Sequence, residues 1–501
     1  MTQRIYGIET EYGLLVHDPE LKLDPVEIAN QIKNHIFLTM RVGVLDLHYR
    51  ANDEPPGNGG FLMNGGRVYL DMGHLEYASP ECSTLTDLLS ADRAGDLLIQ
   101  QAVEELGYSE KISIIKNNVD LETNATFGCH ENYLVKRSFP FDERESLKLL
   151  AAFLTTRQIY CGAGRIGACN PHPFRDWDGV SDFESSEDNV DFQISQRPDH
   201  IPNEFYRWVQ YNRAIVNTRD EPLSDPNKYR RIHLLVGDSN MSEFATAMKM
   251  GTTTLMLDLI QMGAVNPDWI LYESVETMRS ISRDPEFKWE ILMKNGKHST
   301  ALELQWEILE TAKKHLAGSG NETDWILTHW ESVLTDIPKG PEALIGRVDW
   351  ASKYWMLQEF RKDENLDWQD PWLKSQDLEY HNLNREKGLY WCLEENGDAF
   401  RKTTDEAIEC AKETPPRGTR ADGRGELVRA LKQSQVGYLI DWIGFRLSKN
   451  DEPFLMLDPF LSYKSEIRSY LQKMNLQPNQ PADDNLPPPP NPESRSGEKY
   501  S

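Results

Sequence analysis

Short runs in which apolar and polar residues alternate fill much of the first half of the chain. The clearest are RIYGIETEYGLLV at 4–16, GGFLMNGGRVYLDMGHLEYASPEC at 59–82, KISIIKNNVD at 111–120 and TFGCHENYLVKR at 126–137. Side chains of a strand point to opposite faces with a period of two, so alternation is typical of strands that bury one face. These segments predict a β-sheet.

Helical periodicity separates and follows the strand-like runs. Apolar residues recur about every 3.6 positions in LTDLLSADRAGDLLIQQAVEEL at 85–106, and similar patterns predict helices in PVEIANQIKNHIFLTM at 25–40 and SEFATAMKMGTTTLMLDLIQMG at 242–263. Residues 266–396 are predicted to be helix-rich. The strand-like VGYLIDWIGFRL at 436–447 and a helix near 463–474 follow. The predicted class is α+β.

The length of 501 residues suggests two to four domains. We expect a main unit at 1–399, with a flap-like insertion at about 18–60 that ends in the flexible sequence NDEPPGNGG, and a smaller unit at 400–475. The tail at 476–501 has seven prolines in 26 residues and little that could enter a core, so it is predicted to be disordered.

Composition narrows the possible functions. The formal net charge of -26 argues against a nucleic-acid binder, because phosphate backbones require a positive surface. No apolar run approaches the roughly 20 residues that span a bilayer, and no signal peptide is visible, so we expect no membrane partner. The six cysteines form no CxxC pair, which favours neither a zinc site nor a disulfide framework and fits a reducing cytoplasm.

Two glutamates in the first predicted strand, Glu9 and Glu11, share one face because their spacing is two. A carboxylate on an inner face is costly unless it is paired, protonated or bound to a cation. An edge strand with both side chains in solvent is an equally good interpretation of this segment alone.

Ionisable and other polar residues recur on the other predicted strands. The set comprises Arg67, Tyr69 and Asp71 on one face of their strand, then Glu76, Ser79 and Glu81, then His130, Glu131 and Asn132, and finally Arg230, Arg231 and His233. A lone Asp or His of this kind is more often solvated or hydrogen-bonded than functional. Their repetition on neighbouring strands indicates a sheet that lines a polar ligand site.

The residue types suggest what that ligand is. Clusters of carboxylates with little sulphur suit Mg²⁺, which commonly bridges nucleotide phosphates, and arginines suit the phosphates themselves. The set therefore predicts ATP bound through Mg²⁺ over an open sheet. The sequence contains no GxxxxGK[ST] and no kinase signature, and the glycines of GGR at 65–67 and CGAGR at 161–165 are better explained as turns.

Many motifs, in order, resemble the Pup ligase and depupylase family of carboxylate-amine ligases. They include GIETEYG, NGGRVYLD, EYASPEC, GCHENYL, NTRDEP, YRRIHLLVGDSNMSE and IDW, and the resemblance runs from about residue 4 to residue 474. It implies a glutamine synthetase-like curved antiparallel sheet with flanking helices, and a small C-terminal domain. It also implies roles for seven residues: Glu9, Tyr69 and Glu76 as Mg²⁺ ligands, Arg67, Ser79 and Trp442 as ATP contacts, and Asp71 as catalytic base. Ser79 stands where the family commonly has threonine, and Asp71 and Glu76 are one residue closer than in typical ligases.

The family contains two opposed activities. A ligase activates the C-terminal glutamate of Pup, a small protein modifier, and joins it to lysines of target proteins, which marks them for a bacterial proteasome; a depupylase or deamidase adds water instead. The insertion lacks the tryptophan and ARGFD-like run of depupylases, and CGAGR, VDWASKYWMLQEF and LIDWIGFRL resemble the ligase branch, so a ligase is predicted. A small-molecule ligase of the glutamate-cysteine type and a non-catalytic binding protein are the alternatives from other classes.

Overall fold

The computed structural model describes residues 4–49, 54–120, 125–168, 190–208, 213–447 and 452–476, together with the backbone of 175–176 and 179–180. The predicted tail beyond Leu476 and the start of NDEPPGNGG at 52–53 lie outside the described residues. Within the described part, no helix combines the length and the apolar character needed to cross a membrane.

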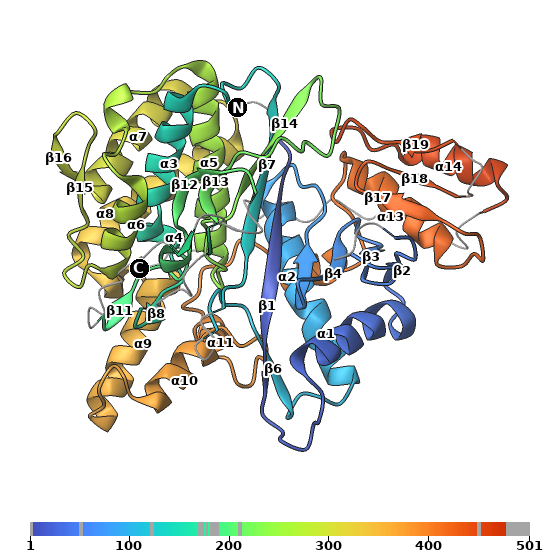
Figure 1. Cartoon of the computed structure of the whole chain (residues 1–501), viewed down its shortest axis with the longest axis horizontal. Helices are drawn as coiled ribbons and strands as arrows, with labels where there is room; N and C mark the ends of the chain where they lie inside the picture. Colours follow the sequence, from blue (N-terminus) through green and yellow to red (C-terminus); the bar gives the residue numbers. More distant parts are fainter. Residues whose placement is uncertain are drawn as a thin grey trace, which may run out of the picture.

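A large sheet runs through the middle of the molecule (Figure 1). Its strands follow the order β12-β13-β14-β7-β1-β5-β4-β3-β2, and β6 pairs with the far end of β1. The bounds are β1 Tyr6–Val16, β2 Gly43–Leu45, β3 Gly59–Leu62, β4 Arg67–Asp71, β5 His74–Ala78, β6 Ile112–Ile115, β7 Cys129–Lys136, β12 Asn203–Tyr206, β13 Ala214–Asn217 and β14 Tyr229–Leu234. The predicted α+β class is confirmed. Antiparallel pairing holds throughout except between β12 and β13, which run parallel.

The stretch 59–82 forms three strands, and its last two make a hairpin. Asp71 pairs with His74 across a two-residue turn formed by Met72 and Gly73. Both turn residues have positive φ, 47° at Met72 and 96° at Gly73, as the tight turns that match the twist of a hairpin require. The turn brings the ends of β4 and β5 to the same point.

Helices cover the sheet and extend to one side of it (Figure 1). The bounds are α1 Pro25–Asn34, α2 Leu85–Glu105, α3 Arg144–Thr156, α4 Gln158–Cys161, α5 Glu243–Met262, α6 Ser274–Arg283, α7 Ala301–Leu316, α8 Asn321–Asp336, α9 Asp349–Glu364, α10 Pro371–Glu379 and α11 Leu389–Glu395. The predicted helices at 85–106 and 242–263 are thus confirmed. The one predicted at 25–40 is regular only to Asn34 and then widens into a π-helical turn at His35–Thr39.

Local sequence explains where these helices begin and end. The side chain of Thr84 caps α2 by accepting from the amide of Asp87, and Ser242 caps α5 by accepting from that of Ala245. Gly263 ends α5 in a left-handed conformation. Helix α5 is buried nearly all round, as expected for a helix with apolar residues on every face.

The C-terminal residues from Arg420 onward lie beside β2 and β3 at one end of the sheet, whereas Asp405–Ala411 pack on α2 (Figure 1). They comprise α12 Asp405–Ala411, α13 Arg420–Leu431, the small sheet of β17 Leu439–Asp441, β18 Gly444–Arg446 and β19 Phe454–Leu455, and α14 Lys464–Lys473. Leu427 and Phe445 belong to the same apolar cluster as Phe61 of β3 and Val68 of β4. The C-terminal residues therefore pack directly on the strands that carry the candidate site.

Candidate active site

One face of the sheet carries most of the ionisable residues that the sequence predicts at a ligand site. Strand register places Glu9 opposite His130 and Ala78, Glu11 opposite Glu76, and Tyr69 opposite Glu76. Residues that lie directly opposite in antiparallel strands point to the same face, so these side chains converge. The interpretation of β1 as a wet edge strand is wrong, because β5 and β7 flank it.

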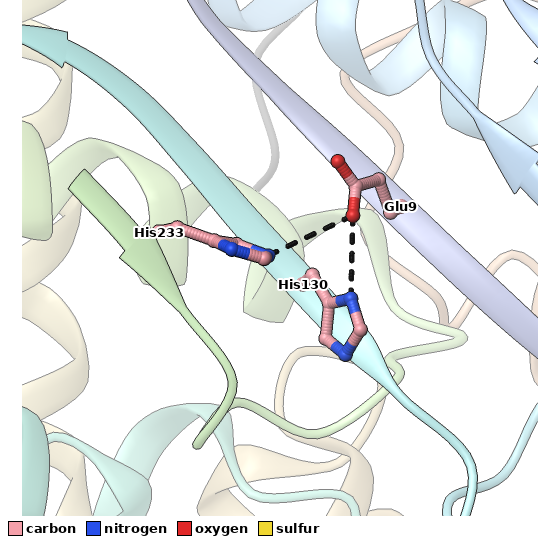
Figure 2. Close-up of side chains that lie close together, drawn as sticks. All are labelled: Glu9, His130 and His233. Carbon is pink, nitrogen blue, oxygen red and sulfur yellow. Dashed lines mark hydrogen bonds and ion pairs between the residues drawn. The ribbon is translucent and has the colours of Figure 1, made fainter. Parts of the chain in front are cut away.

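Glu9 lies among nitrogen donors from β7 and β14 (Figure 2). Its carboxylate oxygens lie 3.2 Å from Nδ1 of His130, 3.0 Å from Nδ2 of Asn132 and 3.7 Å from Nε2 of His233. Burial favours the neutral acid, but the His130 hydrogen bond and the charges of His233, His130 and Arg231 outweigh it and hold the pKa of Glu9 well below its usual range. Glu9 is therefore an ionised carboxylate with two imidazoles beside it.

Three more carboxylates, those of Glu11, Asp71 and Glu76, form a second group that we call the acidic cluster. One oxygen of each lies within 4.8 Å of the others. Burial, followed by the charges of Glu9, Glu11 and Asp71, raises the pKa of Glu76 well above its usual value. Three close carboxylates repel one another unless protons or a cation neutralise them. An oxygen-only donor set of this kind fits Mg²⁺.

Tyr69 and His74 hold two members of the acidic cluster in place. The hydroxyl of Tyr69 donates to Oε1 of Glu76 at 2.5 Å, and Nδ1 of His74 lies 3.0 Å from Oε2 of Glu11. Burial and the Glu76 charge raise the pKa of Tyr69 well above 10, so its hydroxyl is a donor. No local pattern in the sequence predicts this place for His74, because it depends on the hairpin turn, which brings His74 opposite Asp71.

Asp71 ends β4 at the hairpin turn. Among the described residues its carboxylate has no hydrogen bond or ion pair, unlike that of Glu9 or Glu11. Burial and the neighbouring charge of Glu11 raise the pKa of Asp71 above its usual value. A half-buried carboxylate with free oxygens and a raised pKa has the properties of a general base.

A pocket beside Glu9 connects the sheet to the C-terminal residues. Ser79, Trp442, Leu223, Arg231 and Glu9 are among the residues that line it. The ring of Trp442 packs edge-on against Phe61 at 5.2 Å between centroids, and the Arg424 guanidinium lies 4.8 Å from the Trp442 ring. The pocket is therefore lined by an aromatic ring together with charged groups.

Arg67 and Ser79 already have partners within the protein. Arg67 lies over the Tyr69 ring at 4.4 Å and donates from Nη2 to Glu54 at 3.1 Å, while its buried Nε has no hydrogen-bond partner. The Ser79 hydroxyl accepts from the amide of Ile8 at 3.0 Å and donates to the carbonyl of Pro80 at 3.2 Å. An unpartnered nitrogen makes Arg67 the better placed of the two to bind an added anion.

Glu81 joins the end of β5 to the C-terminal residues. Its carboxylate accepts from Nε of Arg420 at 2.5 Å and from Nη2 of Arg424 at 2.7 Å, and Nη2 of Arg424 also donates to the carbonyl of Trp442 at 2.9 Å. Although burial opposes it, the two arginines lower the pKa of Glu81 to about 2. Glu81 thus holds Trp442 at the pocket and is not itself one of the converging carboxylates.

Two further residues expected at the site face away from it. Glu131 lies on the opposite face of β7 and forms a buried bidentate ion pair with Arg157. Arg230 stacks on Phe141 at 4.4 Å and contacts Asp142 and Asp220, whereas its neighbour Arg231 reaches Glu9. Both corrections follow from the period of two, which separates adjacent residues of a strand.

The sheet thus gathers carboxylates next to a pocket lined by arginine and tryptophan, and such a set of side chains is typical of enzyme sites. A family model described as Pup-ligase protein matches residues 4–446. The chain is 34% identical over 488 residues to the Pup--protein ligase of Arthrobacter sp. (strain FB24), which covers 95% of this chain and 100% of that protein. It is 36% identical over 496 residues to that of Corynebacterium glutamicum (strain R), covering 95% and 97%.

Two solved structures have the same fold. The complex between the prokaryotic ubiquitin-like protein Pup and its ligase PafA superposes with a TM-score of 0.79 at 35% identity and covers 95% of this chain and 92% of that one. The Pup ligase PafA in complex with ADP superposes with a TM-score of 0.73 at 33% identity, covering 91% and 94%. The chain belongs to the Pup ligase family.

Proposed function

We propose that this protein uses ATP to activate the side-chain carboxylate of the C-terminal glutamate of a Pup-like modifier as an acyl phosphate, and then joins it to lysine side chains of target proteins. The observation that carries the proposal is the acidic cluster of Glu11, Asp71 and Glu76 beside a pocket walled by Trp442 and Arg231. Relatives solved with ADP and with Pup support the choice of ligands.

The residues divide into two groups by what they would hold. Glu9, Tyr69 and Glu76 would hold the Mg²⁺ ion, and the Tyr69 hydroxyl also donates to Glu76. Glu11, which lies with Glu76 in the acidic cluster, would be a further ligand or the partner of one. Arg67, Ser79 and Trp442 would contact ATP. When bound, ATP supplies the phosphoryl group and Mg²⁺ offsets the charge on the phosphates.

Asp71 would accept the proton of the incoming lysine. The unperturbed pKa of lysine, near 10.4, leaves its amine protonated at pH 7, and an ammonium cannot attack a carbonyl. Transfer of the lysine proton to Asp71 yields the free amine. The amine then attacks the carbonyl carbon of the acyl phosphate and expels inorganic phosphate. The raised pKa of Asp71 brings this carboxylate closer to the range in which a base can both accept and release a proton.

We also propose that two parts of the chain form separate domains with different roles. Residues 1–399, with the insertion at about 18–60, would form the catalytic domain, and residues 400–475 would form a small domain that closes the ATP pocket. The ion pairs from Glu81 to Arg420 and Arg424 support the second role, because they join residues 400–475 to the strands at the pocket wall. The modified targets would pass to a bacterial proteasome.

A gel-shift assay tests the proposed function. The purified protein is mixed with ATP, Mg²⁺, a Pup ending in glutamate and a lysine-bearing acceptor protein, and we expect a new band of higher mass that requires all of them. A parallel reaction replaces the acceptor protein with free amino acids, and another begins from a preformed conjugate. Cleavage of the conjugate without synthesis would identify a depupylase, and product only with free amino acids would identify a small-molecule ligase.

A further inference from the structure

The turn of the β4–β5 hairpin presents a large apolar side chain next to the proposed base. Met72 follows Asp71 directly, and 75% of its surface is exposed, more than for any other exposed large hydrophobic residue of the described chain. Its φ of 47° lies in the left-handed region, where glycine and asparagine are favoured. Asn or Gly at this position would make the turn more stable than Met does.

A second exposed apolar residue lies against the same turn. A Cβ placed on Gly73 would lie 3.1 Å from Cγ2 of Val26, in the first turn of α1, and 48% of the Val26 surface is exposed. Asp24 and Glu27, which cap α1, are exposed beside it. Met72 in the turn and Val26 beside it are thus two exposed apolar residues, which together we call the turn surface, with exposed carboxylates next to Val26.

The position of the turn surface indicates what covers it. If Asp71 takes a proton from a lysine, as the proposed function holds, the protein that carries this lysine must approach within the length of one lysine side chain of Asp71. Such a protein cannot reach Asp71 without lying over or beside the residues next to it. Carboxylates bordering the surface suit a partner whose contact region is basic.

We propose that the turn surface of Met72 and Val26 binds the acceptor protein around its target lysine. Methionine suits this task because its unbranched, polarizable side chain adapts to surfaces of different shape, as a ligase with many targets requires. The inference rests on the proposed function and names the partner that this part of the site contacts. The modifier is the competing occupant, and the experiment below separates the two.

The test compares Met72→Asn with Met262→Asn. Asparagine tolerates the left-handed conformation, so the first change removes the apolar side chain without disturbing the turn. Met262 is a matched control, because it is a methionine with 56% of its surface exposed at the end of α5. For each variant, kcat and KM are measured for a folded acceptor protein and for the modifier. Formation of a hydroxamate with hydroxylamine, an amine too small to contact the turn surface, is measured as well.

We expect Met72→Asn to raise KM for the acceptor protein about fivefold to tenfold, the loss that removal of one well-placed contact residue produces. Hydroxamate formation and KM for the modifier should stay within about twofold of wild type, and Met262→Asn should change none of the three. Val26→Ser should act in the same direction as Met72→Asn.

An increase in KM for the modifier, or no change in KM for the acceptor, would overturn the proposal. Failure of the wild-type protein to form hydroxamate or conjugate would instead overturn the proposed function.

Discussion

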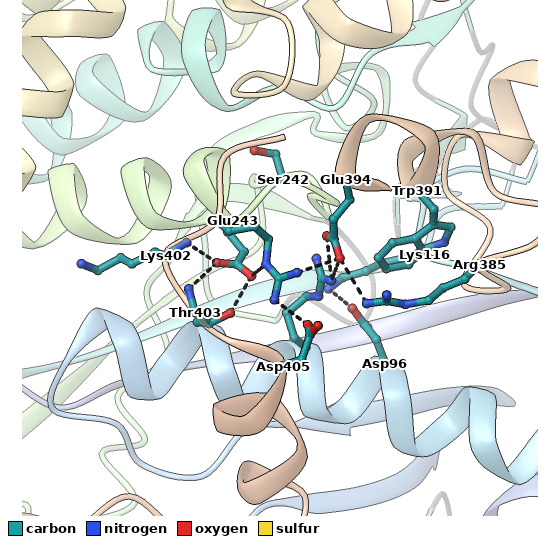
Figure 3. A network of polar contacts seen from close by, with 12 residues as sticks. Asp96, Lys116, Ser242, Glu243, Arg385, Trp391, Glu394, Lys402, Thr403 and Asp405 are labelled. Carbon is teal, nitrogen blue, oxygen red and sulfur yellow. Dashed lines mark hydrogen bonds and ion pairs between the residues drawn. The ribbon is translucent and has the colours of Figure 1, made fainter. Parts of the chain in front are cut away.

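Two groups of buried carboxylates in this protein have opposite surroundings. The first group consists of Glu243 of α5 and Glu394 of α11, which lie in a network of hydrogen-bond donors (Figure 3). Glu394 accepts from Arg93 at 2.9 Å and Arg401 at 2.8 Å, and Glu243 accepts from Arg401 at 2.9 Å. The carboxylates of the acidic cluster, Glu11, Asp71 and Glu76, face one another instead. Tyr69 donates to Glu76, and the imidazoles of His74 and His130 lie 3.0 and 3.9 Å from Glu11.

The contrast separates structural carboxylates from functional ones. A buried carboxylate with arginine partners is satisfied by the fold itself, so its removal leaves an unpaired arginine behind. A cluster of carboxylates without such partners is destabilising unless it takes up protons or a cation, so it is the kind of cluster that a bound ligand can complete. Removing a carboxylate from the group of Glu243 and Glu394 should therefore mainly lower stability. Removing one from the acidic cluster should mainly lower activity.

The largest effect is expected at Asp71, which we place at the reacting amine. Asp71→Asn keeps the shape of the side chain but removes its capacity to accept a proton, so conjugation should fall by about 10²- to 10⁴-fold. Binding of ATP with Mg²⁺, measured by calorimetry, should remain. A variant that conjugates at the wild-type rate in a gel-shift assay would remove Asp71 from the mechanism.

A large loss of stability is expected when Glu394 is truncated. Glu394→Ala leaves the guanidinium groups of Arg93, Arg385 and Arg401 without a shared carboxylate, and breaking a buried pair of this kind costs about 3–5 kcal/mol. Urea unfolding would measure the change. Because the network lies away from the acidic cluster, the variant protein that remains folded should bind ATP normally; weaker binding would show that the two groups are coupled.

How much of the structure can be predicted from the sequence depends on how far apart in the chain the interacting residues lie. Strand β1 and helices α2 and α5 follow from local periodicity, and so does the convergence of Glu9 and Glu11 on one face. The place of His74 depends on a Met-Gly turn that lacks the usual Asn-Gly signal. The partners of Glu81 lie 339 and 343 residues away, which no local pattern could indicate. Trp442 is likewise far in the sequence from the other site residues, so only the family resemblance predicted it, and no local pattern did.

A smaller effect of opposite sign is expected at Glu76. Glu76→Gln replaces a carboxylate that is costly to ionise beside Glu9, Glu11 and Asp71 with a neutral amide, so without Mg²⁺ the variant should be more stable than wild type by about 1 kcal/mol, in the range typical of single substitutions. Its ATP affinity should lose most of its dependence on Mg²⁺, as titrations with and without the metal would show. The matched variant Glu394→Gln should lose stability instead, and a loss of stability in both would contradict the comparison.

The smallest effect is expected at Ser79, which lines the pocket but whose hydroxyl already bonds to the backbone at Ile8 and Pro80. Ser79→Ala leaves the buried amide of Ile8 without its acceptor, at a cost of about 1 kcal/mol, the net value of a typical hydrogen bond. KM for ATP should rise by less than about threefold, because the hydroxyl has little capacity left for the nucleotide. Ser79→Thr keeps the hydroxyl and should preserve both stability and KM. If Ser79→Ala instead raised KM for ATP about tenfold with no loss of stability, the hydroxyl would have to exchange its backbone partners for ATP on binding. Ser79 would in that case belong with the carboxylates of the acidic cluster, as a residue whose contacts are completed by the ligand.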